Sequence, residues 1–336
     1  MSKYYSERGV ALILVLWVTV LLTVMAGGFI AIVRTEARGV ANYKDESQAY
    51  FLARSAVVLA IERLIEEKIN TGLRETAFVE ERWILDGTPR KVLFGDNAFV
   101  ELSIIDESGK VDINSADKPL LDRVCIAMEI EEDDRVVVVA SILDWLDENN
   151  FHRLNGAEDD FYGSLREPYE SKDGPMSIIE ELLWVRGVTP ELFYGESGKG
   201  QKGAPFGEEK SQRAGLANLF TVYTDKAGIN INTAPFELLL ALPGIDSDTA
   251  RKIIDTRIER EFKKMSELAA IGVELSAELG KYITFTSAGF YTVQATGGFL
   301  ERPARYSVKA VVEITNNARY RILYWKDRET VRTSLI

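Results

Sequence analysis

The longest stretch without a charged residue lies near the start of the chain. No charge occurs between Arg8 and Arg34, and the roughly 24 residues from Val10 to Val33 are mostly apolar. A helix of that length rises about 36 Å, which exceeds the hydrocarbon core of a bilayer at about 30 Å. The apolar core of a secretory signal peptide is shorter, at about 7 to 15 residues. The pattern therefore predicts a membrane-spanning helix over residues 10–33.

The helical pattern continues beyond this apolar stretch. From Thr35 to Lys68, apolar and small side chains recur every three or four residues, polar residues lie between them, and no proline interrupts them. Such spacing is typical of an amphipathic helix with one buried face. Asn70 and Gly72 are suitable residues for ending it. We expect one long helix that leaves the bilayer and packs against a globular part.

Alternating, β-branched and aromatic stretches occur in two separate regions and predict strands. They are Arg82 to Leu85, Lys91 to Phe94 and Ala98 to Ile105, and later Phe290 to Ala295, Tyr306 to Ile314 and Tyr320 to Trp325. Turn residues separate them, namely Asp86-Gly87, Gly95-Asp96-Asn97, Gly297-Gly298 and Asn316-Asn317. We expect both regions to contribute to one antiparallel sheet laid on the long helix.

The region between the two sets of strands is mostly helical and looks duplicated. Asp112-Ile113-Asn114-Ser115-Ala116 begins one unit and Asn230-Ile231-Asn232-Thr233-Ala234 begins the other. Asparagine with serine or threonine before a helix is typical of an N-cap, so we expect these residues to cap the helices that follow. A segment from Glu196 to Gln212, rich in Gly, Lys, Ser and Gln, is predicted to be a linker.

These patterns together predict an α+β fold, in which a long amino-terminal helix packs on an antiparallel sheet and a large helical domain of the SAM or helix-hairpin-helix type is inserted. The expected divisions are a leader at 1–9, a transmembrane half of the helix at 10–33, the rest of the helix and first strands at 34–109, an inserted α domain with two related units at 110–283, and carboxy-terminal strands at 284–336.

Composition excludes several functional classes. The 336 residues carry 40 basic and 52 acidic side chains, a formal charge of -12, and an acidic surface repels phosphate backbones. Cys125 is the single cysteine, so no intrachain disulfide can form, and its apolar neighbours predict that it is buried. His152 is the single histidine and has no supporting catalytic motif. A zinc site or a serine-histidine triad is therefore not expected, and we predict a protein without enzymatic activity.

The polar leader ends in Arg8-Gly9 directly before the apolar stretch, and it resembles the leader of type IV pilins and pseudopilins. The resemblance implies that a membrane-embedded prepilin peptidase cuts between Gly9 and Val10 and methylates the new amino-terminus. A plain membrane anchor with a chance glycine is the alternative. Most pilin-like proteins have glutamate at the fifth mature position, which is Leu14 here. A subunit without this carboxylate lacks a partner for a neighbour's amino-terminus, which suits the first subunit of a fibre.

A second motif favours a competing function. The stretch from Asn232 through Leu242-Pro243-Gly244-Ile245 to Arg257 resembles a helix-hairpin-helix element, whose backbone N–H groups can bind a phosphate. A membrane anchor followed by such an element resembles competence DNA-uptake proteins. Asp246 and Asp248 beside the hairpin, and the acidic charge of the chain, favour a packing role instead.

An acidic segment offers a candidate metal site. Asp144-Trp145-Leu146-Asp147-Glu148-Asn149-Asn150 is followed by Asn155-Gly156-Ala157-Glu158-Asp159-Asp160. Carboxylate and amide oxygens suit a hard cation, and calcium takes about six to eight such ligands. The spacing differs from that of an EF-hand. On the residues alone, an ordinary solvated acidic loop is the favoured interpretation.

Motifs in this order along nearly the whole chain resemble the minor pseudopilin K of type II secretion systems, also called general secretion pathway protein K. They are the leader with Leu14, Asp106 to Lys110, Asp144 to Asp147, Asn155 to Glu158, Glu181 to Thr189 and Ile231 to Ala234. The resemblance implies a pilin-like fold with a large inserted α domain. It further implies a place at the pseudopilus tip, where a bulky head blocks addition of another subunit above it.

The same resemblance implies the site, the partners and the location. Calcium would bind in the acidic loop, with Asp147, Asn149, Glu158 and Asp159 as ligands and Asp160 in reserve; the family often has aspartate in place of Asn149. The partners would be the minor pseudopilins I and J, then other pseudopilins, and the prepilin peptidase, with no nucleic acid. The protein would cross the bacterial inner membrane once, with its head in the periplasm, as the basic residues Lys3 and Arg8 of the leader also favour.

Overall fold

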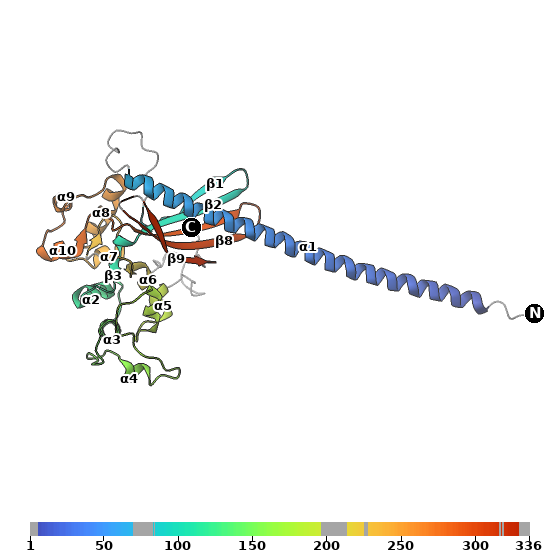
Figure 1. Ribbon diagram of the computed structural model, residues 1–336, viewed down its shortest axis with the longest axis horizontal. Helices are drawn as coiled ribbons and strands as arrows, with labels where there is room; N and C mark the ends of the chain where they lie inside the picture. Colours follow the sequence, from blue (N-terminus) through green and yellow to red (C-terminus); the bar gives the residue numbers. More distant parts are fainter. Residues whose placement is uncertain are drawn as a thin grey trace, which may run out of the picture.

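The computed structural model describes residues 6–69, 83, 85–195, 214–224, 228–315, 317 and 319–328, with only the backbone for 6–10. The beginning of the predicted leader, the predicted helix end at Asn70 and Gly72, and the predicted linker at 196–212 lie outside the described residues. Figure 1 shows a long rod that carries a mixed body of sheet and helices at one end.

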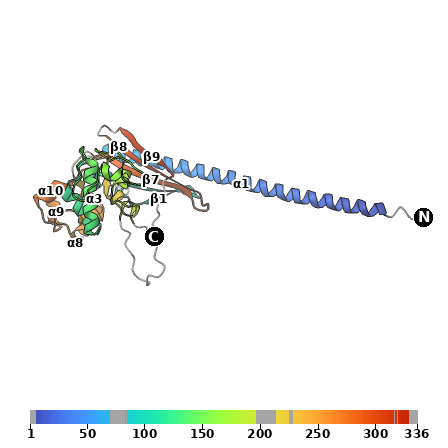
Figure 2. The same cartoon turned by 90° about the horizontal axis from the view of Figure 1, so that it is seen from below.

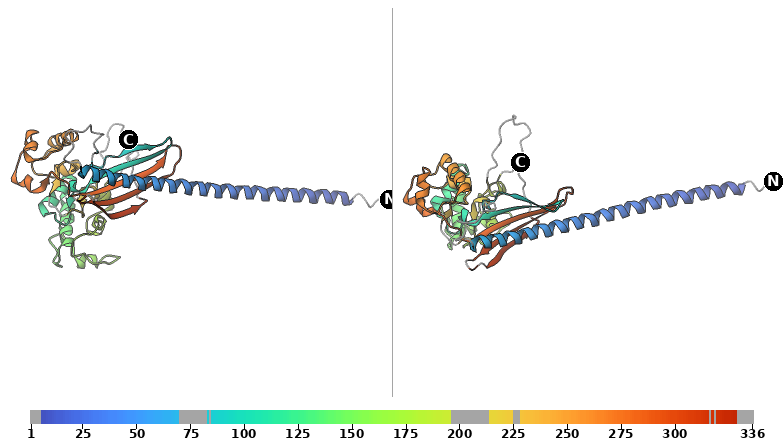
Figure 3. Two further views of the ribbon diagram at one scale, coloured as in Figure 1. Left: turned by 45° about the horizontal axis from the view of Figure 1, so that its top comes forward. Right: turned by 90° about the horizontal axis from the view of Figure 1, so that it is seen from above.

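The rod is a single helix, α1 (Ser6–Ile69). In the described part of the chain, it is the one helix long and apolar enough to cross a membrane. Its amino-terminal half stands free of the body in every view, and its carboxy-terminal half lies on the sheet (Figures 1 and 3). The side chains of the second half that face the sheet are buried and recur every three or four residues, namely Ala49, Ala53, Ala56, Val57, Ala60, Ile61 and Leu64. The predicted amphipathic helix is confirmed.

The sheet has five antiparallel strands in the order β1-β2-β7-β8-β9. Their bounds are β1 (Arg90–Phe94), β2 (Ala98–Asp106), β7 (Phe290–Phe299), β8 (Arg305–Ile314) and β9 (Tyr320–Asp327). The pairing of β2 with β7, from Ala98 opposite Phe299 to Asp106 opposite Tyr291, joins the two regions that are distant in sequence. The predicted sheet from both regions is therefore confirmed, and one of its faces forms a hydrophobic core with α1.

Two predictions about the strands were wrong. Of the predicted strand at 82–85, the structure describes Trp83 and Leu85, and neither lies in a strand. An isolated bridge joins Asp86 to Ile105, and the N–H of Asp106 donates to the carbonyl oxygen of Leu85 at 2.9 Å. Gly297-Gly298 is not a turn but the interior of β7. The physical reason is close packing, because a Cβ atom at Gly297 would lie 2.2 Å from the carbonyl oxygen of Ala49 in α1. Glycine here allows the helix to approach the strand.

Between β2 and β7 the chain forms a mostly helical part with its own hydrophobic core. Its first section holds η2 (Glu107–Gly109), β3 (Val111–Asp112), α2 (Lys118–Ala127), α3 (Glu132–Leu146), α4 (Asp159–Tyr162), η3 (Ile179–Trp184), α5 (Pro190–Tyr194), α6 (Leu216–Leu219) and β4 (Phe220–Thr221). Its second section holds β5 (Ile229–Asn230), α7 (Phe236–Leu240), α8 (Ser247–Glu259), α9 (Met265–Ala270), α10 (Ala277–Tyr282) and β6 (Ile283–Thr284). In each section, a two-residue strand near the start pairs in parallel with a two-residue strand at the end. These pairs are β3 with β4 and β5 with β6.

The asparagines at the start of each section do not cap helices, so that prediction was wrong. Asn114 instead exchanges two hydrogen bonds with the backbone of Met176, at 2.7 and 3.0 Å. Asn232 does the same with Phe262, at 2.8 and 2.9 Å. A side-chain amide has one donor and one acceptor side, as a peptide unit has, and can therefore pair with distant backbone. Asp117 caps α2 in place of Asn114.

The helical part lies at the end of the sheet away from the free half of α1 (Figures 1 and 2). Buried polar groups join it to the sheet. The carboxylate of Asp106, at the end of β2, accepts hydrogen bonds from Ser287 at 3.0 Å and from Asn230 at 3.1 Å. Burial raises the pKa of Asp106, and these hydrogen bonds oppose the rise. The buried Glu107 pairs with Lys110 at 2.9 Å, which fixes the turn into β3.

Candidate metal centre

Carboxylates converge where α3 ends. Its first turn is acidic, which suits the positive end of a helix dipole, and its buried residues Val138, Val139 and Ile142 fix it in the core. Asp144 lies in its last turn and Asp147 follows directly as the C-cap. Negative charge at this end of a helix is unfavourable, because the free carbonyl groups are themselves negative. The two carboxylates therefore favour a nearby cation.

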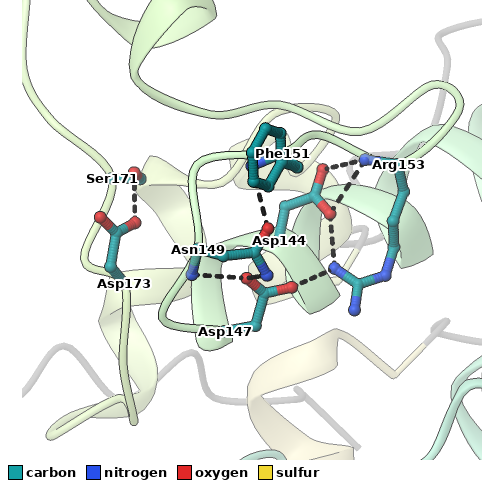
Figure 4. A network of polar contacts seen from close by, with 7 residues as sticks. All are labelled: Asp144, Asp147, Asn149, Phe151, Arg153, Ser171 and Asp173. Atoms are coloured by element: carbon teal, nitrogen blue, oxygen red, sulfur yellow. Dashed lines mark hydrogen bonds and ion pairs between the residues drawn. The ribbon is translucent and has the colours of Figure 1, made fainter.

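Asp144 is the most enclosed of these groups, with a fully buried side chain. The backbone N–H of Arg153 donates to it at 3.1 Å, and Nη1 of the same arginine donates to its Oδ1 at 2.6 Å (Figure 4). The loop passes so close that a Cβ atom at Gly156 would lie 1.8 Å from Asp144 Oδ2. Glycine at this position is therefore a steric requirement of the site.

Glu158 faces the same place from the segment that leads into α4. It is 1% exposed, and within the described residues neither carboxylate oxygen has a hydrogen-bond partner. Burial, followed by repulsion from Asp144, Asp147 and Asp173, raises the pKa of Glu158 to about 7. A buried, unpaired carboxylate is costly, because it has lost water and gained no donor.

Asp144, Asp147 and Glu158 can reach one ion. One ligand oxygen from each lies within 4.8 Å of the other two. Calcium binds oxygen at about 2.3 to 2.6 Å, so two of its ligands can be at most about 5 Å apart. The three carboxylates therefore fit a single hard cation, and the unpaired oxygens of Glu158 supply ligands that nothing else in the described structure uses.

An aromatic cluster forms one side of this region. The ring of Trp145 contacts Tyr162 at 5.3 Å between centroids, Tyr162 stacks on Tyr169 at 5.1 Å, and Tyr169 contacts Trp184 at 5.2 Å. Burial raises the pKa of Tyr162 to about 12, so its hydroxyl stays neutral at physiological pH. Apolar surroundings reduce screening by water and strengthen interactions between the carboxylates and any cation.

The ligands predicted from sequence are only partly brought together. Asp147 and Glu158 belong to the cluster of three. Asn149 instead donates from its side chain to Asp147 at 2.6 Å (Figure 4). Asp159 accepts hydrogen bonds from Ser171 at 2.8 and 2.9 Å. The carboxylate of Asp160 accepts the N–H of Phe161 at 2.8 Å.

Sequence reasoning left Asp144 out of the ligand set, although it begins the acidic segment. Its position three residues before Asp147 places the two side chains on the same side of a helix end, which is a usable signal. Asp173 lies beyond the predicted segment and outside the cluster of three, but its charge adds to the repulsion on Glu158. It accepts a hydrogen bond from the Ser171 hydroxyl at 2.6 Å (Figure 4).

The other residues singled out in the sequence have ordinary surroundings. Cys125 is buried in α2, as predicted, and burial raises the pKa of its thiol to about 12. His152 has a side chain that is 58% exposed and lies 3.9 Å from Asp160. Gly9 and Val10 lie on the backbone of α1, and their role in processing stays a prediction.

The predicted helix-hairpin-helix element is formed by α7 and α8. Gly244 between them has φ of +75°, a conformation that favours glycine. The side chain of Asp246 accepts the backbone N–H of Thr249 at 2.8 Å and thereby caps α8. This carboxylate places negative charge at the helix end where a phosphate would bind.

Comparisons with known proteins show which proteins this chain resembles. Residues 97–194 match the family model for type II secretion system protein K. Relatives with that name are 29% identical in Pectobacterium carotovorum subsp. carotovorum, over 56% of this chain and 60% of that protein, and 24% identical in Aeromonas hydrophila, over 79% and 80%. The protein K of Pseudomonas aeruginosa is 24% identical over 82% of this chain and 80% of its own length. Over these regions the chain is similar to type II secretion system protein K.

A solved structure has a similar fold. The match is to a chain in the crystal structure of the GspK-GspI-GspJ complex from the type 2 secretion system of enterotoxigenic Escherichia coli. The TM-score is 0.58 with 14% identity, over 88% of this chain and 100% of that one. The predicted fold class, a long helix on an antiparallel sheet with an inserted helical part, is confirmed. Residues 224–273 also match the family model of the helix-hairpin-helix motif.

Proposed function

We propose that this protein is the minor pseudopilin K that caps the pseudopilus tip and starts its assembly for protein export. The observation that carries the proposal is the position of the broad helical part, residues 107–284, at the end of the molecule away from the free half of α1. In a fibre whose subunits insert their amino-terminal helices side by side, this head would occupy the place of a subunit above. Growth would then proceed only from below.

The apolar half of α1 is proposed to anchor the protein in the bacterial inner membrane, with the head in the periplasm. Leu14 stands where most pilin-like subunits have glutamate, and it is 61% exposed on the free helix. A carboxylate within lipid is costly unless paired with an amino-terminus of a neighbour. A tip subunit has no neighbour above with which to make this pair, so leucine supports the proposed place.

The proposed partners are the minor pseudopilins I and J of the same system, followed by other pseudopilins. An apolar stripe on α1 supports helix-to-helix association, since Val40, Phe51, Val58 and Ile69 are 58% to 70% exposed. Their spacings of 11, 7 and 11 residues place them on one face of a helix with about 3.6 residues per turn. The stripe faces away from the sheet, where a partner helix can reach it.

Co-purification tests this assembly. The full chain, co-expressed with candidate proteins I and J, should purify with both from detergent extracts, and Phe51→Glu with Val58→Glu should remove most of the recovered partner. Leu275→Glu is the matched control, because it places the same charge on a side chain 44% exposed in the helical part. The proposal fails if the stripe variant retains its partners, or if the tagged chain is found along the length of the pseudopilus.

We further propose that the metal centre binds calcium. Asp144, Asp147 and Glu158 would hold the ion, with Asn149, Asp159 and Asp160 as further candidates from the adjoining loop. The ion would supply a fixed positive charge, and the three carboxylates would then hold the loop between α3 and α4 against the core. Calcium should raise the melting temperature of the full chain, and Asp147→Ala with Glu158→Ala should abolish the rise. An undiminished rise in this variant contradicts the site.

The alternative function is a membrane-tethered DNA-binding protein, and the helix-hairpin-helix match is the observation that favours it. The cap formed by Asp246 and the charge of -12 count against it. A mobility-shift assay on the full chain at several salt concentrations separates the two, because phosphate binding weakens steeply as salt rises. A salt-sensitive shift with duplex DNA would favour the alternative.

A further inference from the structure

Arg153 bridges the two carboxylates at the end of α3. Its Nη1 donates to Asp144 Oδ1 at 2.6 Å and also to Asp147 Oδ2 (Figure 4). Its backbone N–H adds a bond to Asp144, so the loop itself is tied to this carboxylate. The guanidinium therefore binds two of the three side chains that fit a metal ion.

A guanidinium and a metal ion cannot both bind these oxygens without cost. An ion about 2.4 Å from Asp144 Oδ1 would lie within about 5 Å of Nη1, where two cations repel each other. Asp144 has little freedom to present another oxygen, because its side chain is fully buried and Gly156 lies against Oδ2. Binding of a cation between Asp144 and Asp147 would therefore push the guanidinium away.

The arginine satisfies the site incompletely. Both oxygens of Glu158 are buried and, within the described residues, lack a hydrogen-bond partner while Arg153 holds the two aspartates. A divalent cation can reach all three carboxylates, and it carries twice the charge of a guanidinium. The side chain of Arg153 is 43% exposed, so the displaced guanidinium can turn into solvent. Exchange is thus possible without unfolding the loop.

We propose that Arg153 competes with a divalent cation for Asp144 and Asp147, and so sets the cation affinity of the site. This proposal rests on the proposed metal site. The backbone bond of Arg153 to Asp144 can persist when the guanidinium leaves, so the loop keeps its attachment in both arrangements. Arg153 thereby acts on affinity rather than as a ligand of the ion.

Calorimetric titration of calcium chloride into the full chain in detergent tests the proposal. Arg153→Gln should bind calcium at least about fivefold more tightly than the unaltered protein, within the usual range of coupling between two ligands. Arg153→Lys, which keeps the charge, should lie between them. Arg186→Gln is the matched control, since Arg186 contacts the carbonyl oxygen of Gly156 and the ring of Phe161. It should change the affinity less than Arg153→Gln does.

Melting temperatures separate competition from a merely structural role. With a chelator present, Arg153→Gln should melt below the unaltered protein, because three carboxylates then repel without a counter-charge. In saturating calcium the difference should disappear, whereas a structural role would give the same loss in both conditions. Equal or weaker calcium binding by Arg153→Gln, with normal binding by the unaltered protein, overturns this proposal alone. If neither protein binds calcium, the proposed metal site falls as well; if only Arg153→Gln binds it, the competition is supported.

Discussion

Single side chains in this protein act through contacts that their neighbours in sequence do not reveal. Asn114 and Asn232 each pair with distant backbone at 2.7 to 3.0 Å, although their local sequence is typical of helix caps. Glu158 is enclosed by other carboxylates, with no hydrogen-bond partner in the described structure. This position is unfavourable for an unpaired charged group. The contribution of Glu158 to the stability of the fold therefore depends on pH and on bound cations.

Glu158→Gln should alter how stability depends on pH. The folded pKa of about 7 is above the ordinary 4.5, so Glu158 contributes stability that is present below about pH 4.5 and lost as pH rises through 7. Without calcium, the unaltered protein should therefore lose about 1 to 3 kcal/mol of unfolding free energy between pH 5 and 8 relative to Glu158→Gln. Denaturant titrations in a chelator at both pH values measure this. Parallel pH profiles of the two proteins would contradict it.

At the scale of elements, the packing of α1 on the sheet depends on small residues. Ala49, Ala53 and Ala56 are buried on the helix, and Gly297 on β7 lies against Ala49 and Ala53. Backbones can come this close only where side chains are minimal, and the helix then covers the strands that the inserted part separates in sequence. The sequence predicted the helix and most strands because their periodicity is local. It missed the extent of β7, because close approach of another element is not a local property.

Gly297→Ala should be much more harmful than Gly298→Ala. At Gly297 the added Cβ would meet backbone atoms of α1, 2.2 Å from the carbonyl oxygen of Ala49, and a helix backbone cannot move aside cheaply. At Gly298 it would meet the side chain of Arg305, which is exposed and can shift more easily than a helix backbone, although its guanidinium donates to the Arg302 and Ala304 carbonyl oxygens. We expect a loss of about 1 to 3 kcal/mol for the first change and under about 1 kcal/mol for the second. Similar melting temperatures for the two variants would contradict the packing argument.

At the scale of the whole molecule, the protein is a rod with a broad head. The rod joins an apolar half that stands free and a half that forms part of a core (Figure 3). The helical part lies at the far end, tied to the sheet by buried polar groups such as Asp106. We therefore propose that the free end of α1 takes part in maturation and assembly. The helical part at the other end of the molecule would exclude further subunits.

Gly9→Val should block maturation. A prepilin peptidase that cuts after Gly9 needs a small residue there, so the variant should persist as a full-length precursor, while the unaltered protein should begin at a methylated Val10. Mass spectrometry of membrane fractions distinguishes these forms. Gly39→Val serves as the control, because a Cβ there has open space. A normal amino-terminus in the Gly9 variant would contradict the proposed processing.

The sequence by itself determined the long helix, the strands on both sides of the insertion, the buried Cys125 and the acidic segment after α3. Each follows from neighbours a few residues apart, whose spacing decides which face of an element is buried. Only the tertiary structure decided that Asp144 joins Asp147 and Glu158, that Arg153 binds the two aspartates, and that Gly297 belongs to a strand. These features depend on where separate segments come together in space, and the periodicity of one segment contains no such information.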